Sequence, residues 1–383
     1  MKVADVSAVL GELAPLDLAE DGDNVGLLLG DRSGRVAKVM LCIDLTEPVL
    51  AEAIAQRAQM VVAYHPVIYR PVGRVTAQDS PVVHRAIRAR LAVYCPHTAL
   101  DAAPGGADDV LADVLGLVDR RALRPIRRGG DCKLVVFTPP EALHRVSRAA
   151  FDAGAGRIGH YYDCAFFTHG VGTFCGGPGT HPTVGRAGRF EAVEELRLEV
   201  LAPRERLVEV LSAIRAAHPY EQPAIDAYPL TDLPEGCGSG RVGRLPAPQT
   251  VAALVRRIKR AVGVSRVLLV SPHGASRRAG SGGASKRSGD GQGMLVSTAA
   301  VGAGAWGSRY ESALSAGATF LLTGEMRHHH ALDAAARGLT VVCVGHSNSE
   351  RLALVSLARR LRKRLPRLAI TRSGQDADPF EIV

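Results

Sequence analysis

The chain has 383 residues and a formal net charge of +9, and 46% of its residues are hydrophobic but only 4% aromatic. Its length predicts two or three domains, and no apolar run approaches the roughly 20 residues that a membrane-spanning helix needs. Because so few aromatic side chains are available for stacking on bases, we expect no specific nucleic-acid binding and only weak, salt-dependent association.

Residues 1–126 are predicted to form the first half of an α/β domain. The predicted strands span 36–44, 60–66 and 92–97, and the predicted helices span 47–58, 82–91 and 107–116. Strands that alternate with helices indicate a largely parallel sheet covered on both faces.

Residues 127–243 follow a different order and are predicted to form an inserted domain. Strand 132–139, helix 141–154, hairpin 163–177, strand 190–203, helix 204–218 and strand 223–230 are expected. This β-α-β-β-α-β order is typical of a ferredoxin-like (α+β) domain. Glycine-rich flanks at 127–131 and 233–240 are where an insert would join its host.

Residues 244–383 return to the α/β order and are predicted to form the second half of the interrupted domain. Helices are expected at 250–263, 310–317, 329–338 and 349–365, and strands at 266–271, 294–301, 318–325 and 339–346, with a polar loop at 272–293. In the last helix the apolar residues at 354, 357, 358, 361 and 365 share one face.

A carboxylate stands four residues after each of two histidines, in the pairs His97 with Asp101 and His346 with Glu350. Each pair follows a short apolar run that itself follows a helix, and His65 ends another predicted strand. Imidazoles and carboxylates gathered at strand ends are suited to bind a divalent metal ion. The recurrence therefore favours a metal site.

Each of these residues also has a purely structural interpretation. Residues 347–350 spell a helix-capping box that would explain Glu350, and His346 could end a strand without binding anything. Asp101 opens a glycine-rich turn, and turns favour aspartate for local reasons.

Further polar residues follow in the last third of the chain. Glu325 ends a predicted strand and is expected to point into the same cleft, with Glu325 or His329 as general acid or base. Gly302 to Gly307 spell G-x-G-x-x-G, for which a phosphate-binding turn at a helix N-terminus is favoured over a dinucleotide site.

The outer segments resemble one family through residues 23–31, 41–54, 61–75, 95–116, 321–334 and 344–350. It is the family of GTP cyclohydrolase type 2 homologues, also called the Ngg-interacting-factor-3-like dinuclear metal-centre family. Residues 156–174 and 217–230 resemble the PII/CutA-like insert of its longer members. The resemblance implies two similar α/β halves, a toroidal hexamer, and a two-metal site with His65, Asp101, His346 and Glu350 as ligands.

One residue departs from the pattern of many members, which have two consecutive histidines where this chain has Tyr64 and His65. A phenol with a reference pKa of about 10 is a poor ligand at neutral pH, so one or two divalent ions per chain are expected. Zn, Mn, Fe and Mg are not distinguished. His97 could compensate for the missing imidazole or orient another ligand.

The function that these observations indicate is a cytoplasmic, metal-dependent hydrolase acting on a nucleotide or another phosphorylated small molecule. The alternative is a non-catalytic, metal-binding regulatory or scaffold protein with a ligand-sensing insert. The seven cysteines form no C-x-x-C pair and are expected to be reduced. The first residues lack a signal-peptide pattern, and no membrane partner is expected.

Overall fold

A computed structural model describes residues 1–126, 131–159, 161–230, 236–272 and 293–381, so most of the predicted loop at 272–293 lies outside the described residues. The chain divides into two compact units. Unit 1 comprises Met1–Ile126 and Pro234–Val383, and unit 2 comprises Arg127–Leu233. The predicted insert extended to residue 243, but residues 238–243 belong to a strand of unit 1.

The first sheet of unit 1 has five strands in the order β1-β4-β3-β2-β15. These strands are β1 (Gly26–Leu29), β2 (Lys38–Cys42), β3 (Met60–Ala63), β4 (Ala92–Cys95) and β15 (Ala369–Arg372). All neighbours are parallel except β1 and β4. The helices of this part are α1 (Val3–Leu13), α2 (Glu47–Ala55), α3 (Pro81–Arg88), α4 (His97–Ala102) and α5 (Ala107–Leu115).

The second sheet of unit 1 has six strands in the order β11-β14-β13-β12-β10-β5. They are β5 (Val118–Pro125), β10 (Gly238–Thr250), β11 (Leu268–Val270), β12 (Leu295–Ala305), β13 (Phe320–Glu325) and β14 (Thr340–Cys343). Only β12, β13 and β14 run parallel to one another. The accompanying helices are α8 (Val251–Val262), α9 (Tyr310–Ser315), α10 (His328–Ala336) and α11 (His346–Arg364).

The two sheets exchange strands, which the sequence did not predict. β5 comes from the N-terminal segment but pairs with β10 in the second sheet, whereas β15 comes from the C-terminal segment but pairs with β2 in the first. Neither sheet is therefore built from one continuous half of the chain. The outer strands escaped prediction because β15 has four residues and β5 carries exposed arginines, so neither shows a buried apolar run.

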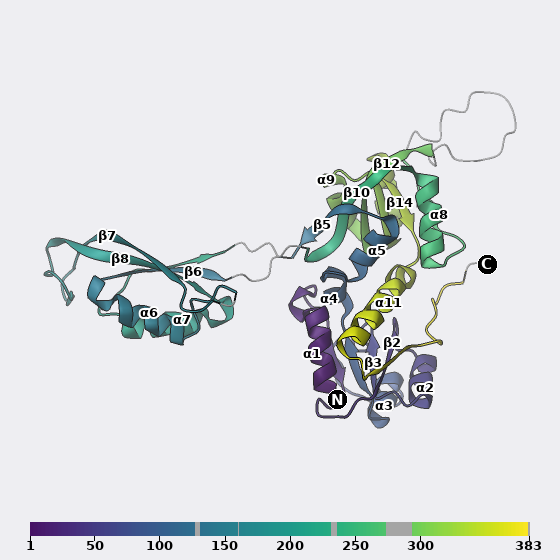
Figure 1. Cartoon of the computed structure of the whole chain (residues 1–383), viewed down its shortest axis with the longest axis horizontal. Helices are drawn as coiled ribbons and strands as arrows, with labels where there is room; N and C mark the ends of the chain where they lie inside the picture. Colours follow the sequence, from purple (N-terminus) through teal and green to yellow (C-terminus); the bar gives the residue numbers. More distant parts are fainter. Residues whose placement is uncertain (127–130, 160, 231–235, 273–292, 382–383) are drawn as a thin grey trace. The chain divides into compact units, whose positions relative to one another are not determined.

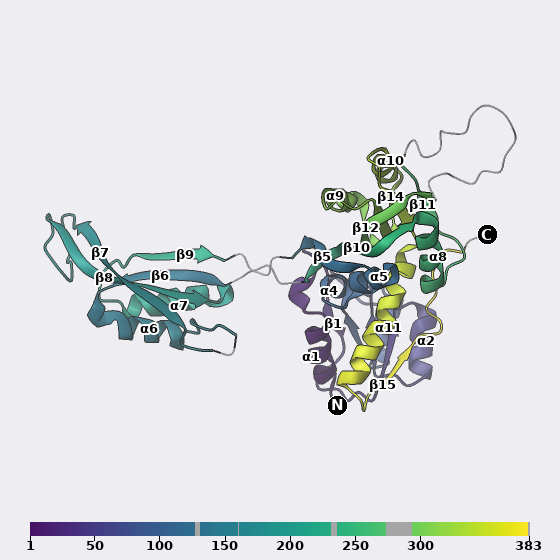
Figure 2. The ribbon, with the colours of Figure 1, turned by 45° about the horizontal axis from the view of Figure 1, so that its top comes forward.

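The main core of unit 1 lies between the two sheets, where Figures 1 and 2 show helices α5 and α11. The predicted apolar face of the last helix is confirmed, since Leu354, Leu357, Ala358 and Leu361 are buried. The core joins this face to residues of both sheets, among them Leu41 and Phe320. No helix in the described part of the chain is long and apolar enough to cross a membrane.

The close packing of Trp306 explains why residue 302, the first glycine of the predicted phosphate-binding turn, is a glycine. A Cβ on Gly302 would lie 1.8 Å from the indole of Trp306, and a Cβ on Gly240 would lie 2.2 Å from it. The buried indole therefore needs both glycines. Gly302 and Gly304 continue β12 instead of forming a turn after it.

Unit 2 contains one four-stranded antiparallel sheet in the order β7-β8-β6-β9. Its elements are β6 (Cys132–Thr138), α6 (Leu143–Asp152), β7 (Ala165–Cys175), β8 (Phe190–Ala202), α7 (Leu207–Ala217) and β9 (Ile225–Pro229). Val146 of α6 and Val210 of α7 are buried against Leu198 and other residues of the sheet.

One predicted element of unit 2 was wrong. Residues 163–177 do not form a hairpin, because β7 runs straight through Gly170 and Gly172 and pairs along its whole length with β8. Gly172 does not turn the chain. Instead it leaves room for the Glu195 carboxylate, which a Cβ would approach to 2.0 Å.

Candidate metal centre

His65 is held at the end of β3 with one ring nitrogen facing the interior. The backbone N–H of His65 donates to the carbonyl of Ile43 at 3.0 Å, which extends the pairing of β3 with β2. Its Nδ1 lies 2.9 Å from Asp44 Oδ1. A hydrogen bond at Nδ1 fixes the ring so that Nε2 is presented to a ligand.

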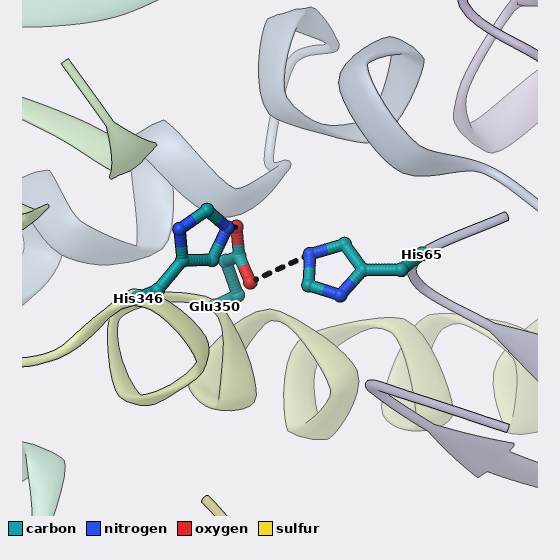
Figure 3. Close-up of side chains that lie close together, drawn as sticks. All are labelled: His65, His346 and Glu350. Atoms are coloured by element: carbon teal, nitrogen blue, oxygen red, sulfur yellow. Dashed lines mark ion pairs between the residues drawn. The ribbon is translucent and has the colours of Figure 1, made fainter. Parts of the chain in front are cut away.

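His346 and Glu350 lie one turn apart at the start of α11 (Figure 3). The spacing of four residues places both side chains on one face of the helix, and His346 Nε2 is 3.3 Å from Glu350 Oε1. The other ring nitrogen of His346, Nδ1, is 3.1 Å from Glu325 Oε1 at the end of β13. Both histidine rings are therefore oriented by a second carboxylate.

These three side chains converge from β3 and α11 on one point. Their candidate ligand atoms all lie within 4.8 Å of one another, and His65 Nε2 is 3.2 Å from Glu350 Oε2 (Figure 3). Both of these atoms are buried, yet neither makes a hydrogen bond of normal geometry with a described residue. The two groups are paired with each other, and an imidazole beside a buried carboxylate is also a combination that could hold a metal ion.

Gly304 of β12 borders the same point. Its φ is +64°, and an added Cβ would lie 2.8 Å from Glu350 Oε1 and 3.4 Å from His346 Nε2. The missing side chain keeps the centre open on this side.

The three side chains carry complementary charges. Burial lowers the pKa of His65, but its contacts with Asp44 and Glu350 outweigh burial and raise the pKa to about 10. Contact with Glu350 raises the pKa of His346 to about 9. Burial raises the pKa of Glu350, but the two histidines outweigh this effect and lower it. Without a metal ion, the carboxylates around the two histidines therefore favour the charged form of both imidazoles.

Asp101 is half-buried beside this cluster and does not belong to the three converging groups. The Tyr64 hydroxyl donates a hydrogen bond to Asp101 Oδ1. Burial, together with the charges of Asp108 and Glu350, holds the pKa of Asp101 well above its usual value. A cation nearby would favour the ionised form of a carboxyl group that lies close to two other carboxyl groups.

His97 points elsewhere, although it begins α4 as His346 begins α11. Its Nδ1 lies 2.8 Å from both carboxylate oxygens of Asp23, and its φ of +25° is rare for a residue with a side chain. Its ring centroid is 5.3 Å from that of His65. His97 thus packs against a candidate ligand.

Glu325 borders a pocket of about 530 Å³ that adjoins the centre. The pocket is lined by Ala305, Gly307, Ser308, Glu325, Met326, Arg327 and His330. His329 is not among these residues, because it is exposed on α10 with its ring against His328.

The structural alternatives for Glu350 and Asp101 were wrong. Helix α11 begins after Gly345, which provides no side-chain cap, and the Ser347 hydroxyl donates to Asp378. Asp101 lies inside α4 and not at the start of a turn. Neither carboxylate is accounted for by local backbone capping.

The family Duf34/NIF3 (NGG1p interacting factor 3) matches residues 1–379. The chain belongs to this family. A GTP cyclohydrolase 1 type 2 homolog of Halalkalibacterium halodurans is 33% identical over 393 residues, covering 100% of both chains. A protein of the same name from Mycobacterium tuberculosis is 36% identical and covers 91% of this chain and 88% of its own.

Solved structures agree with the NIF3 assignment. A Bacillus cereus protein related to NIF3 is 31% identical, with a TM-score of 0.68 and coverage of 100% of this chain and 99% of that one. Staphylococcus aureus protein SA1388, at 23% identity and with coverage of 100% and 99%, has a TM-score of 0.78. The second likeness concerns the fold alone.

Sequence reasoning on this NIF3 chain missed residues that orient the candidate ligands. Asp44 and Asp23 stand in stretches that carry the family resemblance, yet each has a partner distant in the chain, 21 and 74 residues away. Gly304 was assigned to a phosphate-binding turn. A carboxylate directly after a buried strand is the signal that could have indicated Asp44.

Proposed function

We propose that this NIF3 chain is a metal-dependent hydrolase that acts on a nucleotide or another phosphorylated small molecule. The observation that carries the proposal is the convergence of His65, His346 and Glu350 on one point. We assign Asp101 to a further ligand position, because it is a half-buried carboxylate beside the cluster whose pKa the charge of Glu350 helps to raise.

The chain's own residues would bind and orient the substrate. A divalent cation would act as a Lewis acid toward a phosphoryl or carbonyl oxygen. In the adjoining pocket, Arg327 and Ser308 offer a positive charge and a hydroxyl to a phosphate. Glu325, which lines the pocket and contacts His346, is better placed than His329 to transfer a proton.

The names of the relatives support a nucleotide as the substrate. Two proteins that are 33% and 36% identical to this chain are both named GTP cyclohydrolase 1 type 2 homolog. For this chain, the names serve only to choose nucleotides as the first substrates to test.

The test separates metal binding from turnover. Elemental analysis of the purified protein should find bound divalent metal, and Glu350→Gln and Asp101→Asn should each lower its amount. With the metal supplied at saturating concentration, Glu325→Gln should slow metal-dependent product release from a panel of nucleotides. If both ligand-position variants keep full occupancy, the assigned site is wrong.

A second candidate is a metal-binding regulatory protein without turnover. The separate sheet and core of unit 2 favour it. Saturable nucleotide binding without product release would select this candidate over the hydrolase.

We further propose that unit 2 is a ferredoxin-like module and that the chain assembles into a homohexamer. The order β6-α6-β7-β8-α7-β9 and the antiparallel sheet support the first proposal. Sedimentation velocity should give six times the chain mass of 40.4 kDa. A monomer at micromolar concentration would contradict the assembly.

A further inference from the structure

A second pocket, of about 390 Å³, lies entirely within unit 2. It is lined by Gly172, Thr173, Phe174, Gly176, Thr180, Pro182, Thr183, Val184, Glu195, Tyr220, Glu221, Gln222 and Ala224. Neither the metal centre nor the proposed reaction uses any of these residues. Their contacts show how the pocket is built and which ligands it suits.

The pocket uses the sheet face that α6 and α7 leave uncovered. Along β8, the buried residues Leu198 and Val200 face the helices. Glu195 therefore faces the opposite side, because side chains alternate along a strand. There its carboxylate lies over Gly172 of β7, in space that a Cβ would fill.

The connection between β7 and β8 borders the pocket and is fixed to the segment that follows α7. The backbone N–H of His181 donates to Glu221 Oε2 at 3.0 Å, and the Thr183 hydroxyl donates to the carbonyl of Pro219 at 2.8 Å. These bonds join the connection to a second wall of the pocket. The hollow is therefore formed before a ligand arrives.

The lining has one sign of charge. Glu195 and Glu221 are its only ionisable carboxylates, and it contains no lysine or arginine among the described residues. Glu195 is half-buried and forms no ion pair with any described residue. Burial, together with the charge of Glu195, raises the pKa of Tyr220 to about 12, so that its hydroxyl stays neutral.

The apolar part of the lining lies beside this carboxylate. Phe174, Pro182 and Val184 supply carbon surface, and the buried Tyr220 hydroxyl lies beside the Glu195 carboxylate. Aromatic rings near a carboxylate attract organic cations, whereas a phosphate or carboxylate would meet negative charge.

We propose that this pocket binds a small organic cation, a primary ammonium on an apolar body, with Glu195 pairing the charge. Phe174 and Val184 would contact the apolar body, and the Tyr220 hydroxyl would hydrogen-bond to the ligand. The pocket discriminates by charge, so it binds neither nucleotides nor other phosphorylated molecules.

Three probes of one shape and different charge test the inference on the full chain. Phenethylamine, 2-phenylethanol and phenylacetate are each titrated by calorimetry at pH 7. Phenethylamine should bind saturably, 2-phenylethanol about tenfold more weakly, as expected for loss of one charge-assisted hydrogen bond, and phenylacetate not at all. Hydrogen exchange at residues 172–184 should slow only with the amine.

Two substitutions on the same strand separate the carboxylate's role from a loss of folding. Glu195→Gln keeps the shape of the side chain and should weaken phenethylamine binding about tenfold. Glu194→Gln is the matched control, because Glu194 is exposed on β8 beside His169 and does not line the pocket. This control should bind the amine as the unmodified chain does.

Tyr220→Phe provides a further measurement and should weaken the amine less than Glu195→Gln does. Equal binding of the three probes, no saturable binding of the amine, or unchanged binding in Glu195→Gln would each overturn the inference. None of these results depends on bound metal or nucleotide turnover.

Discussion

Gly304 borders the candidate metal centre with a backbone conformation that disfavours a side chain. Gly304→Ala would place a methyl group 2.8 Å from Glu350 Oε1 at a φ of +64°. We expect the metal affinity to fall about tenfold to a hundredfold, as for other groups that orient ligands. The free energy of unfolding should fall by about 1–2 kcal/mol from the left-handed backbone alone. A chelator competition and a urea titration measure the two effects.

Gly338→Ala is the matched control for this substitution. Gly338 has a φ of +84° but no heavy atom within 4 Å of an added Cβ. It should lose similar stability and keep its metal affinity. If both variants lose affinity equally, backbone strain and not the contact with Glu350 is responsible.

His218 makes the stability of unit 2 depend on pH. Its buried ring lies 3.0 Å from the carbonyl of Phe137 through Nε2, and its Nδ1 accepts a hydrogen bond from the Tyr220 N–H at 3.1 Å. Burial lowers the pKa of His218 below 6.5. Between that lowered value and 6.5, the unfolded state binds more protons than the folded state, so stability rises with pH.

We therefore expect unit 2 to lose stability as the pH falls below about 6.5. Urea titrations at pH 5 and pH 7.5, followed by hydrogen exchange in β6 and α7, measure this loss. His218→Gln should abolish the part of the pH dependence that His218 causes. The same slope in this variant would assign the effect to other groups.

The sequence predicted which candidate ligands lie together better than it predicted their orientation. His65, His346 and Glu350 stand at predicted strand or helix ends, and the structure brings them together. The pair His97 and Asp101 has the same spacing as His346 and Glu350, but His97 turns toward Asp23, 74 residues away. The spacing of residues along a helix determines which side chains lie on the same face. It does not determine which distant residue each side chain contacts.

At the scale of elements, apolar periodicity predicted the buried strands and helices but misjudged glycine. The hairpin expected at 163–177 is a single strand that contains Gly170 and Gly172, and the predicted joint at 233–240 contains the unit boundary but also the start of β10. In each case a bulky neighbour explains the glycine, Glu195 over Gly172 and Trp306 over Gly240. Such neighbours are supplied by tertiary packing and leave no local pattern.

The boundary of the insert leads to a prediction about β10. Pro125 pairs with Gly238, and the Ile126 N–H donates to the Cys237 carbonyl at 3.4 Å. A short Gly/Ser linker in place of residues 127–233 can therefore close β5 and β10 into a hairpin. We expect a soluble, metal-loaded protein with the circular dichroism of an α/β domain.

Extending the same replacement to residues 127–243 should fail. It removes the residues around Arg241 that pair with both β5 and β12, and the ion pair of Arg241 with Asp109 at 2.7 Å. We expect this longer deletion to aggregate. A well-folded product would mean that the start of β10 is dispensable to the second sheet.

At the scale of the whole molecule, the sequence predicted the α/β class and an interruption in the middle of the chain. It did not predict the exchange of β5 and β15, because a strand's own residues do not specify which sheet it joins. Pairing across such distances is decided by the folded core that α5 and α11 share with both sheets.

The position of β15 also sets the order in which the molecule can be completed during its synthesis. Thr371 reaches the carbonyl of Val39 across 332 residues of chain. At a synthesis rate of about 5–20 residues per second, on the order of half a minute passes between the synthesis of β2 and that of β15, its last neighbour in the sheet. Throughout that interval one edge of the nascent first sheet is unpaired, and unpaired edges recruit other strands. Chaperone demand should therefore be highest just before residues 369–372 emerge from the ribosome.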